Sequence, residues 1–306
     1  MPEKVSRRDV LKAGAVAGTG LVASGVIASE TVQGGPFKLN YAPHFGMFSN
    51  SAGSDLVDQL SFAADEGFRA WEDNGMRGKS VETQERLGAA MDRLGITMGV
   101  FVANSIGWSD PTLTTGKAEH IDKFVADCND SAEVAKRVGA KWMTVVPGTI
   151  DRRREMDYQT ANIIDVLRRG AEIFEPHGLV MVLEPLNFFN HPNLFLTKMS
   201  QAYSICRAVD SPSCKILDDL YHQQIQEGNL IPNIDHAWSE IAYFQVGDNP
   251  GRREPRTGEI NFQNVFKHIH SKGFKGVVGM EHGKSQAGKE GERKLINAYR
   301  WADDFQ

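Results

Sequence analysis

The chain carries a recurring pattern of apolar and polar positions from Phe37 onward. Stretches of helical length, in which apolar residues recur at spacings of three and four, alternate with short and almost continuously apolar runs. The apolar runs predict strands that are buried on both faces, as in parallel sheets covered by helices. Eight strands are predicted in this way, at residues 38–42, 69–72, 98–102, 142–146, 180–183, 215–217, 241–246 and 277–280.

A glycine separates several helical stretches from the next strand. Glycine is favoured directly after a helix because it adopts the left-handed conformation without steric cost. Such junctions recur at Gly67, Gly95, Gly139, Gly178 and Gly273. Strands that alternate with helices in this way predict an α/β fold, a single-domain (β/α)8 TIM barrel. A doubly wound open sheet is the alternative, but it requires a glycine-rich phosphate loop after the first strand, and residues 40–46 (NYAPHFG) do not form one.

The first thirty residues differ from the rest in composition. Arg7 and Arg8 precede an apolar stretch of small residues from Ala13 to Ala28, which is too short and too rich in Gly and Ala to predict a membrane span. This segment resembles a twin-arginine export signal, and an ordinary basic tail is the alternative. We therefore expect a signal segment at residues 1–30, the barrel at residues 31–306, and a periplasmic or otherwise exported protein with the twin-arginine machinery as a partner.

Length, charge and cysteine content narrow the class of protein further. The 306 residues fit one barrel and a short appendage. A formal net charge of −5 supplies no cationic surface for nucleic acid, which we exclude as a partner. Cys128, Cys206 and Cys214 lack the spacing of a zinc ribbon or a disulfide framework, and we predict that they are buried thiols.

The residues that end the strands indicate the chemistry, because the C-terminal strand ends of a barrel converge on one mouth. In the second half of the barrel these residues are Glu184, Asp219, Gln245 and Glu281. Carboxylates that point into one small space repel one another unless a cation lies among them. All-oxygen ligands favour Mg²⁺ or Mn²⁺, with Co²⁺ and Zn²⁺ as alternatives. The sequence therefore predicts a divalent metal site at these four residues.

The first half of the barrel ends in polar residues of a different character. They offer side chains whose partners the sequence does not identify: His44, Glu72, Asn74 and Asn104. Three aromatic residues near strand ends, Trp71, Trp108 and Phe188, are interpreted either as core or as a wall on which a sugar stacks.

Several segments resemble the hydroxypyruvate isomerase family, within the wider superfamily of xylose isomerase-like barrels. They are Leu183–Asn187 (LEPLN), Asp219–His222 (DLYH), Phe244–Arg252 (FQVGDNPGR), Arg253–Phe262 (REPRTGEINF) and Gly279–Gly283 (GMEHG). The resemblance extends to individual motifs from about residue 180 to residue 283. In the part of the chain before residue 180 it concerns only the order of strands and helices. It implies that Glu184, Asp219, Gln245 and Glu281 are metal ligands, and that Glu184 and Glu281 are also the acid and base beside the reacting carbons.

The resemblance also implies a set of substrate-binding residues. His222 and Arg252 match residues that hold substrate oxygens, and Glu259, in the same long run, joins them as a candidate. The guanidinium of Arg252 suits a substrate carboxylate, because its planar fork can donate two parallel hydrogen bonds. The alternatives are a loop salt bridge from Arg252 to Asp248 or Glu254, and a packed histidine at the start of a helix for His222.

One residue departs from the pattern of the family. Arg256 stands where the family commonly has glycine, and we expect its long side chain to intrude beside the substrate. This difference, together with the predicted export, argues against hydroxypyruvate itself as the substrate. Carbohydrate breakdown in the periplasm suits an exported enzyme better than central metabolism does.

Proton transfer next to a carbonyl explains why such residues meet. Isomerising an α-hydroxy carbonyl requires a base for the carbon-bound proton and positive charge for the oxygens of the resulting enediolate. Two carboxylates and a divalent metal supply both, so an isomerase or epimerase on a small hydroxy-keto acid or sugar is the leading hypothesis. A metal-dependent lyase or hydratase on oxidised (3-keto) sugars is the alternative.

Two other function classes fit the sequence less well than an isomerase or a lyase does. A zinc-dependent endonuclease of the same superfamily needs further histidine and aspartate ligands and a basic groove, and a non-catalytic sugar-binding protein has no use for the full carboxylate set. The predicted partners are a small-molecule substrate and the export machinery, while a homo-oligomer is left open.

The export hypothesis can be tested on the two arginines alone. Replacing Arg7 and Arg8 with lysine keeps the charge but removes the twin-arginine pair. The precursor should then accumulate in the cytoplasm, as measured by cell fractionation and immunoblotting. Finding the mature protein outside the inner membrane at its usual level would contradict the hypothesis.

Overall fold

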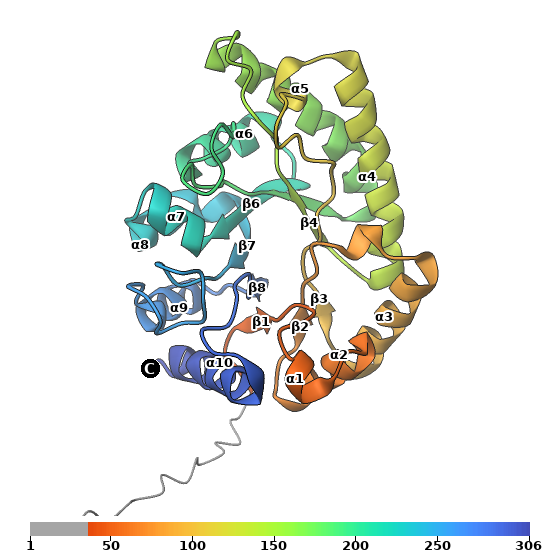
Figure 1. Ribbon diagram of the computed structural model, residues 1–306. Coiled ribbons are helices and arrows are strands. Elements are labelled where there is room, and N and C mark those ends of the chain that lie inside the picture. Colours follow the sequence, from red (N-terminus) through yellow and green to blue (C-terminus); the bar gives the residue numbers. More distant parts are fainter. Residues whose placement is uncertain (1–35) are drawn as a thin grey trace, which may run out of the picture. The chain divides into compact units, whose positions relative to one another are not determined.

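Eight short strands lie at the centre of the structure and the helices lie outside them (Figure 1). The computed structural model describes residues 36–306, so the signal segment predicted for residues 1–30 lies outside the described residues. The strands are β1 (Asn40–Ala42), β2 (Ala70–Trp71), β3 (Thr97–Met98), β4 (Trp142–Val145), β5 (Val180–Leu183), β6 (Cys214–Asp219), β7 (Ile241–Gln245) and β8 (Val277–Gly279). Each of them overlaps one of the eight predicted apolar runs.

Helices follow the strands along the chain. They are α1 (Ser49–Ala52), α2 (Leu56–Asp65), α3 (Val81–Leu94), α4 (Ala118–Val138), α5 (Met156–Phe174), α6 (Met199–Val209), α7 (Leu220–Gln226), α8 (Leu230–Ala237), α9 (Phe262–Ser271) and α10 (Gly288–Asp303), with 3-10 turns at Met76–Gly78, Leu113–Thr115, Glu175–His177 and Trp238–Glu240. Between residues 36 and 306, no helix has the length and apolarity that a membrane span needs. All five junction glycines have positive φ, from 65° to 93°, which confirms the predicted helix ends.

The strands close into a barrel. Parallel neighbours run in the order β1-β8-β7-β6-β5-β4, and β2 pairs with β3. Two parallel bridges complete the ring: His44 with Glu72 joins the segments after β1 and β2, and Val102 with Thr144 joins the segment after β3 to β4. The predicted (β/α)8 barrel is confirmed, and the alternative of an open doubly wound sheet is wrong.

Side chains from the strands and their immediate extensions fill the barrel interior. The buried cluster contains Ala42, Ala70, Val100, Val180, Val182, Leu217, Tyr243 and Val277. Successive side chains of a strand point to opposite faces, so a residue two positions after an interior residue also points inward. Ala70, Val182, Leu217 and Tyr243 thereby place the next inward residues above this layer, at the C-terminal mouth of the barrel: Glu72, Glu184, Asp219 and Gln245.

A larger apolar core lies between the strands and the helices. Trp71 belongs to this core: it is fully buried and its ring packs 4.8 Å from that of Phe45. The interpretation of Trp71 as part of a sugar-stacking wall is therefore wrong. Cys128, Cys206 and Cys214 are buried and unpaired, as predicted.

Candidate active site

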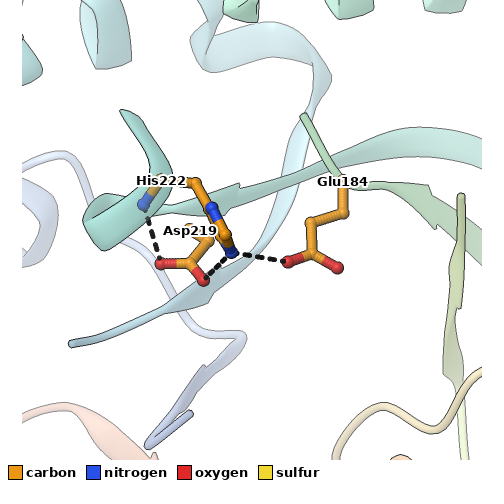
Figure 2. A group of neighbouring side chains, drawn as sticks. All are labelled: Glu184, Asp219 and His222. Atoms are coloured by element: carbon orange, nitrogen blue, oxygen red, sulfur yellow. Dashed lines mark hydrogen bonds and ion pairs between the residues drawn. The ribbon is translucent and has the colours of Figure 1, made fainter. Parts of the chain in front are cut away.

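Glu184, Asp219 and His222 form a buried cluster at the mouth of the barrel. Glu184 directly follows β5, Asp219 ends β6, and His222 lies in the first turn of α7. One atom from each side chain lies within 4.8 Å of the other two, and no more than 7% of any of the three residues is exposed. Figure 2 shows the imidazole of His222 between the two carboxylates. The two carboxylates of this cluster could take part in holding a metal ion.

The helix that follows β6 holds Asp219 in place. Asp219 caps α7, because its Oδ1 accepts the backbone N–H groups of Tyr221 at 2.8 Å and His222 at 3.4 Å. Its Oδ2 faces the cluster and lies 3.6 Å from Nε2 of His222. The cap therefore fixes the carboxylate and leaves one oxygen directed at the cluster.

Gln245 adds an amide to this cluster. It is the sheet partner of Asp219 across β6 and β7, and only 1% of it is exposed. Its Nε2 donates to Oε2 of Glu72 at 3.2 Å, whereas its Oε1 is buried without a hydrogen-bond partner among residues 36–306. Leaving a buried acceptor unsatisfied costs about 1–3 kcal/mol. A cation beside Asp219 would satisfy this oxygen, so the residues fit the predicted oxygen-ligated metal site.

Arg252 joins the cluster to Glu281. Its Nη2 lies 3.1 Å from Oδ2 of Asp219 and 2.7 Å from Oε2 of Glu281, and its Nε donates to the backbone oxygen of Glu281. In the described part of the chain it forms no salt bridge with Asp248 or Glu254. Only Nη1 is left for a substrate oxygen, so the predicted pair of parallel hydrogen bonds to a substrate carboxylate does not fit this conformation.

The hydrogen bonds of His222 decide which of its nitrogens carries the proton. Nδ1 accepts the backbone N–H of Asn187 at 3.2 Å and also its side-chain Nδ2 at 2.6 Å. The amide of Asn187 is itself oriented, because its Oδ1 accepts the backbone N–H of Asn190. Burial lowers the pKa of His222 to about 4, so the ring is neutral and its proton lies on Nε2. His222 therefore offers the cluster an N–H donor, as a substrate-binding residue does, and not a lone pair for a metal.

Burial perturbs the acidic groups of the site strongly. It raises the pKa of Glu281, whose side chain is 26% exposed, to about 7. Burial likewise raises the pKa of Glu184 well above its usual value, and repulsion from Glu281 and Asp219 adds to the effect. The pKa of Glu72 is raised for the same main reason. A divalent cation would reverse this situation, because nearby positive charge favours the ionised carboxylates.

A cavity of about 280 Å³ lies beside Glu281, lined by residues that follow β1 and β2. Among them, Asn74 donates from Nδ2 to Oε1 of Glu281 at 2.8 Å. Nε2 of His44 lies 3.2 Å from the backbone oxygen of His282, which accepts the hydrogen bond. The first half of the barrel thus orients Glu281 and extends the site beyond the cluster, whereas Asn104 bonds the backbone of Val146 instead.

A family model described as xylose isomerase-like TIM barrel matches residues 60–304. The chain belongs to this family. The family assignment inferred from the segments between residues 180 and 283 is thus confirmed at the level of the xylose isomerase-like barrels. The predicted metal ligands Glu184, Asp219, Gln245 and Glu281 come from those segments.

Two curated relatives and one solved structure are similar to this member of the xylose isomerase-like barrels. Hydroxypyruvate isomerase of Escherichia coli (strain K12) is 31% identical over 166 residues, 54% of this chain and 64% of that protein. The 2-oxo-tetronate isomerase of Pectobacterium atrosepticum is 29% identical over 173 residues, 56% of this chain and 66% of that protein. Both matches span just under two thirds of the relative. A 3-keto-D-glucoside 4-epimerase from E. coli shares the fold, with a TM-score of 0.70 at 18% identity over 86% of this chain and 98% of that one.

Two residues that the sequence places near the substrate lie away from the cluster. Glu259 is exposed, and its carboxylate accepts hydrogen bonds from Asn249 at 2.8 Å and Gln224 at 3.2 Å. Arg256 has a φ of 76°, a left-handed conformation that glycine adopts without steric cost. Its guanidinium lies 4.9 Å from the ring centroid of Trp301 in α10, so the expectation that it intrudes beside the substrate is wrong.

Sequence reasoning missed three partners within the site. Glu72 and Asn74 are visible in the sequence as polar strand ends, but nothing there shows that they bond Gln245 and Glu281. Asn187 lies in the LEPLN segment, yet its bonds to His222 depend on how the loop after β5 folds back.

The raised carboxyl pKa values predict how stability depends on pH without metal. Between the usual value of 4.5 and about 7, the folded protein holds a proton on Glu281 that the unfolded chain has lost. The free energy of unfolding should therefore fall as the pH rises through this window, by at most about 1.4 kcal/mol per pH unit for each extra proton. Buried His222 acts in the opposite direction, but only below about pH 6.5.

We expect the melting temperature in excess chelator to fall between pH 6.5 and pH 7.5, as Glu281 loses its proton, and to level off above that. The fall should be smaller in Glu281→Gln, and saturating Mn²⁺ should remove it, as measured by differential scanning calorimetry. Equal slopes for the wild type and Glu281→Gln in chelator would show that Glu281 does not hold the proton.

Proposed function

We propose that this protein is a metal-dependent isomerase or epimerase that moves a proton next to the carbonyl of a small hydroxy-keto acid or sugar. The observation that carries the proposal is the buried pair of carboxylates Glu184 and Asp219 at the mouth of the barrel, beside the unpartnered amide oxygen of Gln245 on the neighbouring strand. Arg252 joins Glu281, a further carboxyl that can transfer a proton, to Asp219. Similarity to two isomerases supports the same class of reaction.

The metal would be held by Glu184, Asp219, Gln245 and Glu281. Bound there, a divalent cation would supply Lewis-acid stabilisation of the negative charge that develops on the substrate oxygens. The all-oxygen donor set favours Mg²⁺ or Mn²⁺ over metals that prefer nitrogen or sulfur. This choice leaves His222 free to bind substrate, in agreement with its tautomer.

The side chains around the metal site bind the substrate and transfer the proton. Nε2–H of His222 donates to a substrate oxygen, and Asn187 keeps that proton in place. Nη2 of Arg252 bridges Asp219 and Glu281, and Nη1 is left for the substrate. Glu184 and Glu281 follow strands that are separated by β6 and β7, so they approach the substrate from different sides. One removes the proton from carbon and the other returns it.

The surroundings of the site favour a sugar over a three-carbon acid. Trp108 and Phe188, which follow β3 and β5, are about half exposed, and the ring of Trp108 stacks on His191, which contacts His222. Aromatic faces of this kind suit a sugar ring. The cavity of about 280 Å³ beside Glu281 offers room for the rest of a polyhydroxy chain.

A lyase or hydratase on a 3-keto sugar is the second candidate, and the same aromatic residues and cavity support it. The first step is the same proton removal by Glu184 or Glu281, and the reactions differ in whether a C–O bond then breaks. Export through the twin-arginine pathway, if confirmed on residues 1–30, would place either reaction in the periplasm. NMR spectra of the products distinguish an isomer from an elimination product.

The two glutamates can be tested by proton exchange in deuterated water. We expect Glu184→Gln and Glu281→Gln each to lower turnover of hydroxypyruvate, D-fructose or a methyl 3-keto-glucoside, whichever the wild type converts, by roughly 10²–10⁴-fold. The variant that lacks the abstracting base should also lose exchange of the substrate's α-proton, followed by NMR. The variant that lacks the second group should still exchange it.

Metal content is measured in parallel, because either substitution also removes a metal ligand. Glu172→Gln, on the exposed face of α5, is the control and should keep full activity. Near-normal turnover in both metal-loaded variants would contradict the proposed mechanism.

A further inference from the structure

Glu72 is a buried acid that the proposed reaction does not use directly. It follows β2, only 2% of it is exposed, and its Oε2 accepts hydrogen bonds from the hydroxyl of Tyr243 at 3.0 Å and from Nε2 of Gln245 at 3.2 Å. We propose that Glu72 is a positioning residue that fixes the amide of Gln245 with its oxygen toward the metal site. This inference rests on the proposed metal-dependent function.

The amide of Gln245 needs such a partner because its two ends are alike in size. Turned by 180°, it would present an NH2 group to the carboxylates of the site and could not ligate a cation. Two of those carboxylates already have a donor, because Nη2 of Arg252 bonds both Asp219 and Glu281. The NH2 group of Gln245 bonds Glu72 instead, and Oε1 is left without a hydrogen-bond partner among the described residues.

A chain of hydrogen bonds sets the direction of this contact. The backbone N–H of Val100 donates to the hydroxyl oxygen of Tyr243 at 3.3 Å, and a backbone N–H can only donate. Tyr243 therefore directs its own proton to Glu72, whose Oε2 must accept. Since Oε2 is an acceptor, Gln245 meets it with its NH2 group. The orientation of the amide follows from the backbone after β3, independently of any metal.

The barrel also makes room for Glu72. Gly279, at the end of β8, is the sheet partner of Gln245, and a Cβ atom there would lie 2.0 Å from Oε2 of Glu72. Any larger residue would push the carboxylate away from Gln245. Glycine at this position and Tyr243 two residues before Gln245 thus hold the carboxylate against the amide.

The hydrogen bond from Gln245 to Glu72 affects the strength of metal binding as well as the orientation of the amide. Donation of an N–H to a carboxylate increases the negative charge on the oxygen of the same amide, because hydrogen-bonded groups polarise one another. Residues that orient a metal ligand typically change metal affinity by 10–100-fold when they are replaced. Replacing Glu72 should therefore lower metal affinity directly, and should lower turnover only as a consequence of that.

The test is the affinity of the full chain for Mn²⁺, measured by isothermal titration calorimetry after chelator treatment. In Glu72→Gln the new amide can donate as well as accept, so the orientation of Gln245 is no longer fixed, and we expect binding roughly 10–100-fold weaker. Glu240→Gln is the control, because Glu240 is a similarly buried acid, 4% exposed, that lies directly before β7 and is paired with Lys215. It should leave Mn²⁺ affinity unchanged.

A double variant exchanges the donor and the acceptor. In Glu72→Gln with Gln245→Glu, the amide at position 72 donates to the carboxylate at position 245, which keeps an oxygen for the metal and the same total charge. We expect Mn²⁺ affinity to recover to within a few-fold of the wild type. Circular dichroism monitors folding, and the double variant decides the question if Glu72→Gln alone does not fold.

The outcomes separate this inference from the proposed function. If the wild type binds no divalent cation, the proposed function fails. If the wild type binds Mn²⁺ and either Glu72→Gln binds it equally well or the folded double variant gives no recovery, Glu72 does not position Gln245.

Discussion

The concentration of buried acidic groups at one end of the barrel is the constraint on which the site depends. Parallel strands that close into a ring bring Glu72, Glu184, Asp219 and Glu281 to the same mouth, where the first three are buried and the side chain of Glu281 is 26% exposed. Burial and mutual repulsion disfavour their charged forms. In the described chain Arg252 compensates Asp219 and Glu281, and a divalent cation would add positive charge beside these two and Glu184. The same crowding supplies the proton-transfer groups, so binding of the metal and catalysis have one physical origin.

Much of this arrangement could be predicted from the sequence, because local patterns determine it. Apolar runs and junction glycines locate all eight strands, and the period of two along a strand shows which residues face the interior. That rule alone places Glu184, Asp219 and Gln245 together at the mouth. The order of the motifs then gives the family, which the match over residues 60–304 confirms.

What the sequence could not show are contacts between residues far apart in the chain. The bond of Glu72 to Gln245 and that of Asn74 to Glu281 cross the barrel, and they depend on side-chain rotamers and on the space left by Gly279. The place of Arg256 was predicted wrongly for the same reason, and Trp71 was left open between the core and the site. A side chain of either kind can face the site or the helix layer, and backbone conformation and packing decide which.

The proposed function requires that the cation is held by carboxylate oxygens and by the amide oxygen of Gln245. The most direct measurement is a crystal structure of the Mn²⁺-loaded protein with anomalous diffraction at the manganese edge. We predict one anomalous peak, about 2.0–2.4 Å from Oε1 of Gln245 and from carboxylate oxygens of Glu184, Asp219 and Glu281, with Nε2 of His222 outside bonding distance. No peak at the mouth of the barrel, or a peak bonded to His222 in place of Gln245, would contradict it.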